Sequence, residues 1–204
     1  MRAGAHVLKR ERPRPTVRVV HEGFVVRKNG EIVDASSTVA VIDSGDIRIV
    51  VDTGSPMDIY VLQSELQRAK IELESVNYVV NTHMHLDHSG CNDLFCNATI
   101  CAHALERPPI GSLKVTGDVV LAPGVTLVLT PGHTAGSISV FVESARRYAI
   151  CGDAIPTKAN YTSHIPPAIN LNRKLAVMSM DRILSWADVV IPGHGAPFDV
   201  ARNK

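Results

Sequence analysis

The densest group of chemically active side chains lies at residues 83–88, where the sequence reads HMHLDH. His83 and His85 alternate along the chain, so in an extended segment both imidazoles face the same side and can meet one cation. Asp87 and His88 follow two residues later and can bind a second cation nearby. Because zinc and similar ions bind imidazole nitrogen and carboxylate oxygen, the segment predicts a metal site. A surface loop with accidental histidines does not concentrate such residues beside an apolar run.

Three further metal-type residues follow in the second half of the chain, each directly after a glycine: His133 in TPGHT, Asp153 in CGD and His194 in PGHG. Glycine permits the tight turn that presents the next side chain from the end of a strand. Taken singly, His133 or His194 would be an ordinary loop histidine about half the time. Together with residues 83–88 they complete a site for two divalent metal ions. Zinc is the default for such a nitrogen-rich set, and manganese or iron fits the same ligands.

The hydrophobic pattern indicates which elements position these residues in the first half of the chain. Valine-rich runs predict a β-meander of three strands, at residues 16–26, 32–43 and 47–52, with a hairpin turn at Asn29-Gly30. Ser55-Pro56 then predicts the start of a helix, with Ser55 as its cap and apolar residues at helical spacing behind it.

The ligand residues are expected on loops that leave strands. Residues 76–81 read as a buried strand, residues 83–88 as its exit loop, and residues 89–95 as the beginning of a short helix. Further strands are predicted at residues 118–121, 125–129, 137–142, 148–151 and 187–191, with a late helix at residues 171–186. This mixture predicts a layered α/β domain.

Size and composition limit the other possibilities. A chain of 204 residues with 45% hydrophobic and 20% charged residues suits one globular domain, and a net charge of +1 does not indicate a nucleic-acid or membrane partner in bulk. No apolar run is long enough to span a membrane. The four cysteines form no CxxC pair, so we expect reduced, buried thiols and neither a zinc ribbon nor a disulfide.

The first fifteen residues differ from the remainder because they carry five basic side chains against one acidic side chain. We expect residues 1–15 to be a flexible basic tail and residues 16–204 to be the folded domain. The alternative for the tail is a weak tether to an anion or to RNA. No apolar segment of a secretory signal follows it, so the expected location is the cytoplasm.

The order HxHxDH, PGHT, GD and PGHG resembles the pattern of the metallo-β-lactamase superfamily over roughly residues 20–198. The resemblance implies a single-domain αββα sandwich with the metal site at one edge of two facing sheets. It implies a first metal on His83, His85 and His133. A second metal would lie on Asp87, His88 and His194, and Asp153 would bridge the two.

Other stretches refine the resemblance. The VDTG stretch matches an early DxG element of the family, in which Asp52 would orient the metal ligands. The ending ADVVIPGHGAPF and the internal stretch DHSGCNDLF are similar to one branch of the superfamily that has been linked to RNA cleavage. The cysteine ligand of true zinc β-lactamases is missing, as are the large insertion of β-CASP nucleases and the helical carboxy-terminal extension of glyoxalase II. Hydrolysis of penicillins and of glutathione thioesters is therefore not favoured.

We expect a dinuclear metal-dependent hydrolase in which a metal-bridging hydroxide attacks a small ester, lactone or thioester. Asp87 would hold or shuttle the proton of the attacking water. The alternative is metal-dependent cleavage of RNA phosphodiesters, and iron-dependent chemistry of the sulfur dioxygenase type or a non-catalytic metal-binding module is less favoured. The expected partners are that small molecule or RNA, with no membrane, and a homodimer is the candidate assembly.

Substrate contacts are expected from residues 155–170, because this segment leaves the bridging ligand and shows neither helical nor strand periodicity. Lys158 could hold an anionic group, Tyr161 could donate to a developing oxyanion, and His164 lies in the same segment. The alternative for this segment is an exposed connector.

Overall fold

Side-chain alternation along the strands creates three apolar layers. In β4 (Val39–Ser44), Ala40 and Ile42 point between two sheets, whereas Val39 and Val41 pack under a helix. Successive side chains of a strand face opposite sides, so a strand that is buried on both faces reads as a continuous apolar run. The same division recurs in β5 (Ile47–Val51), where Ile49 faces the other sheet.

The protein is described by a computed structural model over residues 14–201. Its first sheet has the strand order β1-β4-β5-β6-β7-β8. The strands not yet defined are β1 (Thr16–His21), β6 (Tyr78–Val80), β7 (Thr99–His103) and β8 (Leu113–Val115).

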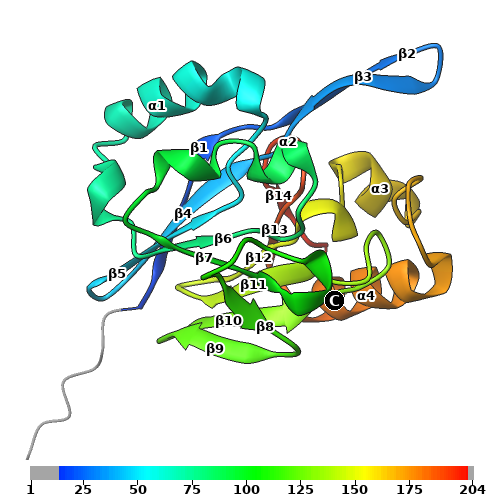
Figure 1. The fold of residues 1–204 in the computed structure, drawn as a ribbon. Coiled ribbons are helices and arrows are strands. Elements are labelled where there is room, and N and C mark those ends of the chain that lie inside the picture. The colour runs from blue at the N-terminus through cyan, green and yellow to red at the C-terminus, as the bar shows by residue number, and fades with distance from the viewer. Residues whose placement is uncertain (1–13, 202–204) are drawn as a thin grey trace, which may run out of the picture.

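The second sheet has the order β14-β13-β12-β11-β10-β9, and it faces the first (Figure 1). Its strands are β9 (Val119–Ala122), β10 (Val125–Leu129), β11 (Ile138–Glu143), β12 (Arg147–Ile150), β13 (Val189–Ile191) and β14 (Phe198–Asp199). A separate two-stranded ribbon, β2 (Phe24–Lys28) and β3 (Glu31–Ser36), extends away from both sheets.

One long helix covers the outer face of each sheet (Figure 1). Helix α1 (Ile59–Arg68) buries Leu62 and Leu66 against the first sheet, and α4 (Arg173–Trp186) buries Met180 and Ile183 against the second. The predicted αββα sandwich is therefore confirmed. The shorter helices are α2 (Leu86–Ser89), α3 (Lys158–Ser163), η1 (Pro56–Asp58), η2 (Leu73–Ser75), η3 (Asn92–Leu94), η4 (Ala104–Glu106) and η5 (Gly152–Ala154). Within residues 14–201, no helix is long and apolar enough to cross a membrane.

The first predicted strand is wrong as a single element. The chain leaves the sheet after His21, and β1 pairs antiparallel with β4, so the β2–β3 ribbon is inserted between two neighbours in the sheet. The Gly23 amide donates to Thr38 Oγ1 at 3.1 Å, which fixes the point where the ribbon departs. The predicted turn at Asn29-Gly30 is confirmed, because both residues have positive φ and β2 pairs with β3 across them.

Of the other local predictions, the helix cap is confirmed and the loop at residues 83–88 is only partly correct. Ser55 caps η1 by accepting from the Met57 amide, as predicted. Residues 83–88 are not a loop throughout, because α2 carries Asp87 and His88. Strands β7 and β8 were not predicted, since the short run at 99–103 is held by parallel pairing with β6 and not by its own pattern.

The predicted basic tail lies outside the described residues, except for its last two positions. Pro15 is buried, and the γ carbon of its ring lies 2.9 Å from the position that a Cβ on Gly124 would take. Within the described residues, Pro15 already packs against the fold, immediately before β1.

Candidate metal centre

The candidate ligands meet because the strands before them end at the same edge of the sandwich. Strands β5 and β6 are parallel, as are β12 and β13, and β10 runs in the same direction as β12 because both are antiparallel to β11. His83 follows β6, His133 follows β10, Asp153 follows β12 and His194 follows β13. Exit loops of parallel strands collect side chains at one edge, so residues more than a hundred positions apart become neighbours.

His83, His85 and His133 form one group of converging nitrogens. His85 Nδ1 lies 3.0 Å from His83 Nε2 and 3.0 Å from His133 Nε2. The rings of His85 and His133 are perpendicular to each other, at 90°. Three imidazole nitrogens that approach one point from different directions form a donor set for a divalent ion.

Asp87, His88 and His194 form a second group, and Asp153 lies between the two. One oxygen of Asp153 lies 3.5 Å from His88 Nε2 and 3.3 Å from His194 Nε2, while its other oxygen lies 3.5 Å from His133 Nε2. The Asp87 carboxylate lies 3.9 Å from His88 Nε2 and 3.8 Å from His194 Nε2. Asp153 thus faces both groups, as a bridging carboxylate would.

In three of these histidines, the ring nitrogen that faces away from the centre, Nδ1, already has a hydrogen-bond partner. His133 Nδ1 lies 2.7 Å from the Ile169 carbonyl, and His194 Nδ1 lies 2.9 Å from the Ser36 carbonyl. His83 Nδ1 lies 3.2 Å from Thr82 Oγ1. A histidine that binds a metal commonly donates its other ring N–H in this way, which fixes the tautomer and the ring orientation.

Asp52 orients two of the ligand-bearing segments. One of its carboxylate oxygens accepts from the Thr82 amide at 2.8 Å, and the other lies 2.8 Å from His88 Nδ1. Asp52 is buried and has a φ of 55°, in the left-handed region that side chains other than glycine seldom adopt. Backbone strain of this kind persists where surrounding contacts hold it and gathers at functional sites.

Sequence reasoning missed Glu106, which lies on η4. Its carboxylate accepts from the Met84 amide at 3.0 Å, the Gly136 amide at 3.0 Å and the Thr134 hydroxyl at 2.7 Å. One side chain therefore ties the loop of His83 and His85 to the loop of His133. The available signal was a lone acidic residue in a segment without recognised structure, which is too weak to single out.

Burial and neighbouring charges shift the pKa values of His83, in the first group, and His88, in the second, in opposite directions. Burial, followed by the nearby His88, lowers the pKa of His83 well below its usual value. Although burial opposes it, the Asp52 carboxylate with help from Asp153 raises the pKa of His88 well above its usual value. Burial likewise opposes ionisation of Asp153, yet His194 and His88 hold the pKa of Asp153 well below its usual value. The centre therefore combines a neutral imidazole at His83, an imidazole at His88 that favours its protonated form, and an ionised carboxylate at Asp153.

Gly193 shows why a glycine precedes a ligand. A Cβ at this position would lie 2.3 Å from an oxygen of Asp153, so any side chain would displace the carboxylate. We expected these glycines to permit tight turns, and Gly132 and Gly152 do have positive φ, whereas Gly193 is required by the close approach of the Asp153 carboxylate.

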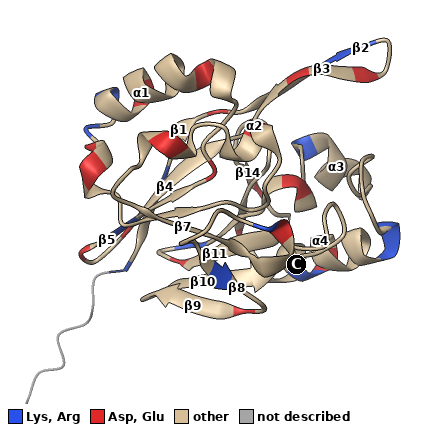
Figure 2. Cartoon of the chain, viewed as in Figure 1, with Lys and Arg blue, Asp and Glu red and all other residues tan. Residues whose placement is uncertain are grey.

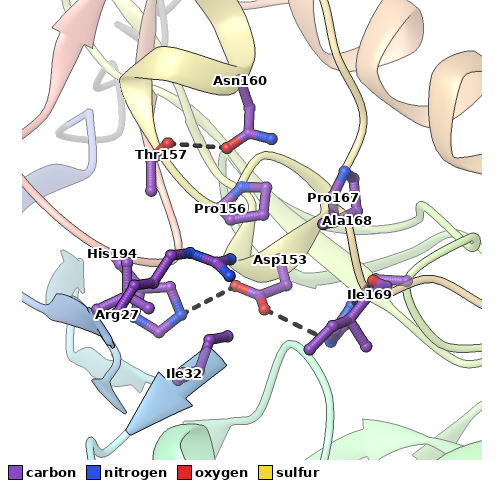
Figure 3. A pocket seen from close by; sticks show the side chains of 12 residues that line it. Arg27, Ile32, Asp153, Pro156, Thr157, Asn160, Pro167, Ala168, Ile169 and His194 are labelled. Carbon is purple, nitrogen blue, oxygen red and sulfur yellow. Dashed lines mark hydrogen bonds and ion pairs between the residues drawn. The ribbon is translucent and has the colours of Figure 1, made fainter. Parts of the chain in front are cut away.

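Two cavities open onto the ligands. The smaller, of about 160 Å³, is lined by His133, Asp153 and His194 together with Arg27 of the ribbon and the segment after η5 (Figure 3). The larger, of about 570 Å³, shares those three ligands and adds His85, Asp87 and an apolar wall that includes Val33, Met57 and Leu86. The β2–β3 ribbon contributes to both cavities, although no pattern in its residues connects it with the site.

The structure does not bring the three predicted substrate residues to these cavities. Lys158 and Tyr161 lie on α3, where Tyr161 stacks on Phe198 and its hydroxyl accepts from the Ala201 amide at 2.8 Å. His164 lies at the end of α3, exposed, 3.1 Å from the Asp181 carboxylate of α4. The helical turn directs these side chains away from the ligands, while Thr157 and Asn160 line the smaller cavity in their place.

Comparison with known proteins places this geometry in context. The family model described as "Metallo-beta-lactamase superfamily" matches residues 32–122. A protein of Methanocaldococcus jannaschii named as a metallo-hydrolase is 34% identical over 181 residues, which cover 87% of this chain and 86% of the relative. "Metallo-beta-lactamase domain-containing protein 1" of Xenopus laevis is 32% identical over 92% of this chain and 83% of its own length.

Lactone hydrolases are also similar to the chain. N-acyl homoserine lactonase AiiA of Bacillus thuringiensis subsp. kurstaki is 31% identical over 135 residues, 58% of this chain and 54% of that protein. A solved N-acyl homoserine lactone hydrolase, with N-hexanoyl-L-homoserine at its catalytic metal centre, superposes with a TM-score of 0.69 at 21% identity. The superposition covers 91% of this chain and 94% of the other.

Proposed function

The chain belongs to the metallo-β-lactamase superfamily and is a metal-dependent hydrolase, and we propose that it uses two divalent metal ions, zinc by default, to hydrolyse a small ester, lactone or thioester. The similarity to lactone hydrolases supports a carbonyl substrate. The proposal rests chiefly on one observation about the centre, the state of its buried polar atoms.

Of the five buried side-chain atoms without a hydrogen-bond partner among the described residues, two lie in the centre: His88 Nε2 and one oxygen of Asp153. The contacts around them, at 3.3 and 3.5 Å, lack hydrogen-bond geometry. Leaving such groups unsatisfied costs on the order of 1–3 kcal/mol each, more for a charged group. Both atoms point at the space between the imidazoles, where a cation would satisfy them. The donor set of nitrogen and carboxylate oxygen suits zinc, manganese or iron.

We assign the ligands by their grouping. His83, His85 and His133 would hold one ion, and Asp87, His88 and His194 would hold the other. Asp153 would bridge them, since its two oxygens face different groups. Asp52 would act by holding His88 through its outer nitrogen and not by touching a metal or a substrate.

Bound metal ions supply two things in such a site: a hydroxide at neutral pH and polarisation of the substrate's carbonyl oxygen. The protein contributes the remainder. Asp87 lines the larger cavity and is only partly buried, so its carboxylate can accept a proton from the attacking water and pass it to the leaving group. The apolar wall beside it excludes water from the part of the substrate that lies in this cavity, which strengthens the electrostatic contacts at the centre.

RNA cleavage gains no support from the described site. Arg27 is the one Lys or Arg side chain within residues 14–201 that lines either cavity. Basic and acidic residues are interspersed along the described elements (Figure 2), whereas proteins that bind a phosphodiester backbone use several cations. Iron-based oxygen chemistry would more naturally use one metal, and both ligand groups are complete here.

The test is elemental analysis of freshly purified protein, followed by a substrate screen. We expect close to two divalent ions per chain and turnover of one or more of the esters, lactones or thioesters, abolished by a chelator and restored by zinc. Single-stranded RNA and oxygen consumption are measured in parallel. Absence of stoichiometric metal after reconstitution, or turnover of RNA alone, would overturn the proposal.

A further inference from the structure

The β2–β3 ribbon places one positively charged side chain, that of Arg27, in a cavity beside the metal centre. Val25 and Arg27 are two positions apart on β2, so their side chains share a face of the ribbon, and both line the smaller cavity. Ile32 lies directly opposite Arg27 in the pairing and lines the same cavity. The face of the ribbon turned to the ligands is therefore apolar with one guanidinium.

An irregularity in the pairing sets this orientation. Val26 pairs with Asp34 and Arg27 pairs with Ile32, so Val33 is passed over. An extra residue on one strand bends a ribbon and turns the side chains around it, and such bulges recur beside active sites. Here the bulge places Val33 in the larger cavity and leaves Ile32 in both.

The Arg27 side chain points into the smaller cavity, toward Asp153 (Figure 3). Its one hydrogen bond given by the structure is from Nη1 to the Gly30 carbonyl at 3.2 Å, and no ion pair of Arg27 occurs within residues 14–201. A guanidinium has five N–H donors, so most of them remain available to a ligand. Two other polar residues that line this cavity already have hydrogen-bond partners. Thr157 donates to Asn160 at 2.8 Å, and Asn160 donates to the Ile165 carbonyl.

We propose that Arg27 binds a carboxylate of the substrate, an inference that rests on the proposed function. The enzyme would then prefer esters, lactones or thioesters whose acyl part ends in an anionic group. The planar guanidinium fork matches a carboxylate in a bidentate manner. A cavity of about 160 Å³ accommodates a short acyl chain with that group. The leaving group then occupies the larger, apolar cavity, which shares His133, Asp153 and His194 with the smaller one.

The test uses two esters that differ by one terminal carboxylate, 4-nitrophenyl hexanoate and mono-4-nitrophenyl adipate. We expect the zinc-loaded protein to hydrolyse the adipate half-ester with a kcat/KM about tenfold or more above that of the hexanoate, as a charge-assisted hydrogen bond implies. Arg27→Ala should abolish this preference, mainly by raising KM for the adipate half-ester, so that the two esters are hydrolysed with similar kcat/KM. Arg27→Lys should retain part of the preference.

Lys28→Ala is the matched control, because Lys28 is the next residue on the ribbon, is exposed and lines neither cavity. Equal kcat/KM for the two esters in the unmodified protein, an equal loss for both in Arg27→Ala, or the same change in Lys28→Ala would overturn the inference.

Calorimetric titration of the zinc-loaded protein with adipate and with hexanoate separates this inference from the proposed function. If neither of these esters and none of the lactones or thioesters of the screen is turned over, the proposed function fails. Tighter binding of adipate that depends on Arg27 would still support the anion site, and equal binding of the two acids would overturn it.

Discussion

Asp52 Oδ2 and His88 Nδ1 lie 2.8 Å apart in a pair from which solvent is excluded. The same carboxylate holds the backbone and hydroxyl of Thr82, the residue before His83. One side chain at the end of β5 therefore orients ligands of both proposed metal ions. Its place in the fold explains why an acidic residue tolerates an uncommon backbone conformation there.

We predict that Asp52→Asn weakens binding of the ion held by His88 by about 10- to 100-fold, because the amide cannot supply the negative charge at His88 Nδ1. Asparagine tolerates the left-handed conformation, so the fold should be retained. Competition with a chromogenic chelator measures the affinity. Asp46→Asn, in an exposed turn, is the control. Unchanged affinity in Asp52→Asn would remove Asp52 from the centre.

Glu106→Gln should reduce stability and metal binding together. The amide can accept from fewer of the three donors, so we expect a loss of about 2 kcal/mol in the free energy of unfolding. The ion held by His83, His85 and His133 should be lost first, since Glu106 ties their two loops. Denaturant melts and metal titrations measure both effects, with the exposed Glu74→Gln as the control. A variant that loses stability but binds metal normally would show that the clamp does not reach the ligands.

Single ligand substitutions should separate a shared ligand from an unshared one. Asp153→Ala should disturb both ions because its oxygens face both groups, whereas His133→Ala should chiefly remove one. Elemental analysis after gel filtration gives the number of ions per chain. Retention of both ions by Asp153→Ala would contradict the bridging role.

Thiol reactivity should distinguish Cys96 from the other cysteines. Burial raises the pKa of Cys91 and of Cys101 to about 11, and the fully buried Cys151 is shifted further in the same direction. The thiolate is the reactive form, so at pH 8 only about one in a thousand of the Cys91 or Cys101 thiols is ionised. With an aromatic disulfide reagent we expect one thiol per native chain, the exposed Cys96, and four after unfolding. Rapid labelling of several thiols in the native protein would contradict the burial.

Tyr161→Phe should change stability and not turnover. Loss of the hydrogen bond from the Ala201 amide should cost about 1 kcal/mol, while kcat/KM stays within about twofold because the ring packs on Phe198 away from the cavities. The exposed Tyr60→Phe should change neither. A lower kcat with unchanged stability would restore Tyr161 to a role with the substrate.

The sequence by itself determined the candidate ligands and the architecture. Metal-type residues at fixed spacing, each at the end of an apolar run, are readable because ligand chemistry restricts residue type and because strands impose a period of two. The apolar runs before His83 and His194 likewise predicted strands, and β6 and β13 lie there.

Only the tertiary structure decided what surrounds the ligands. Glu106 acts on residues 22 and 28 positions away, and Arg27 lines a cavity with Asp153, because loops and a ribbon fold back over the edge of the sheets. Tyr161 was predicted at the site from its nearness in sequence to Asp153, yet one helical turn directs it elsewhere. Periodicity specifies which face of an element is buried; where an irregular segment returns is set by long-range packing, and no local pattern encodes it.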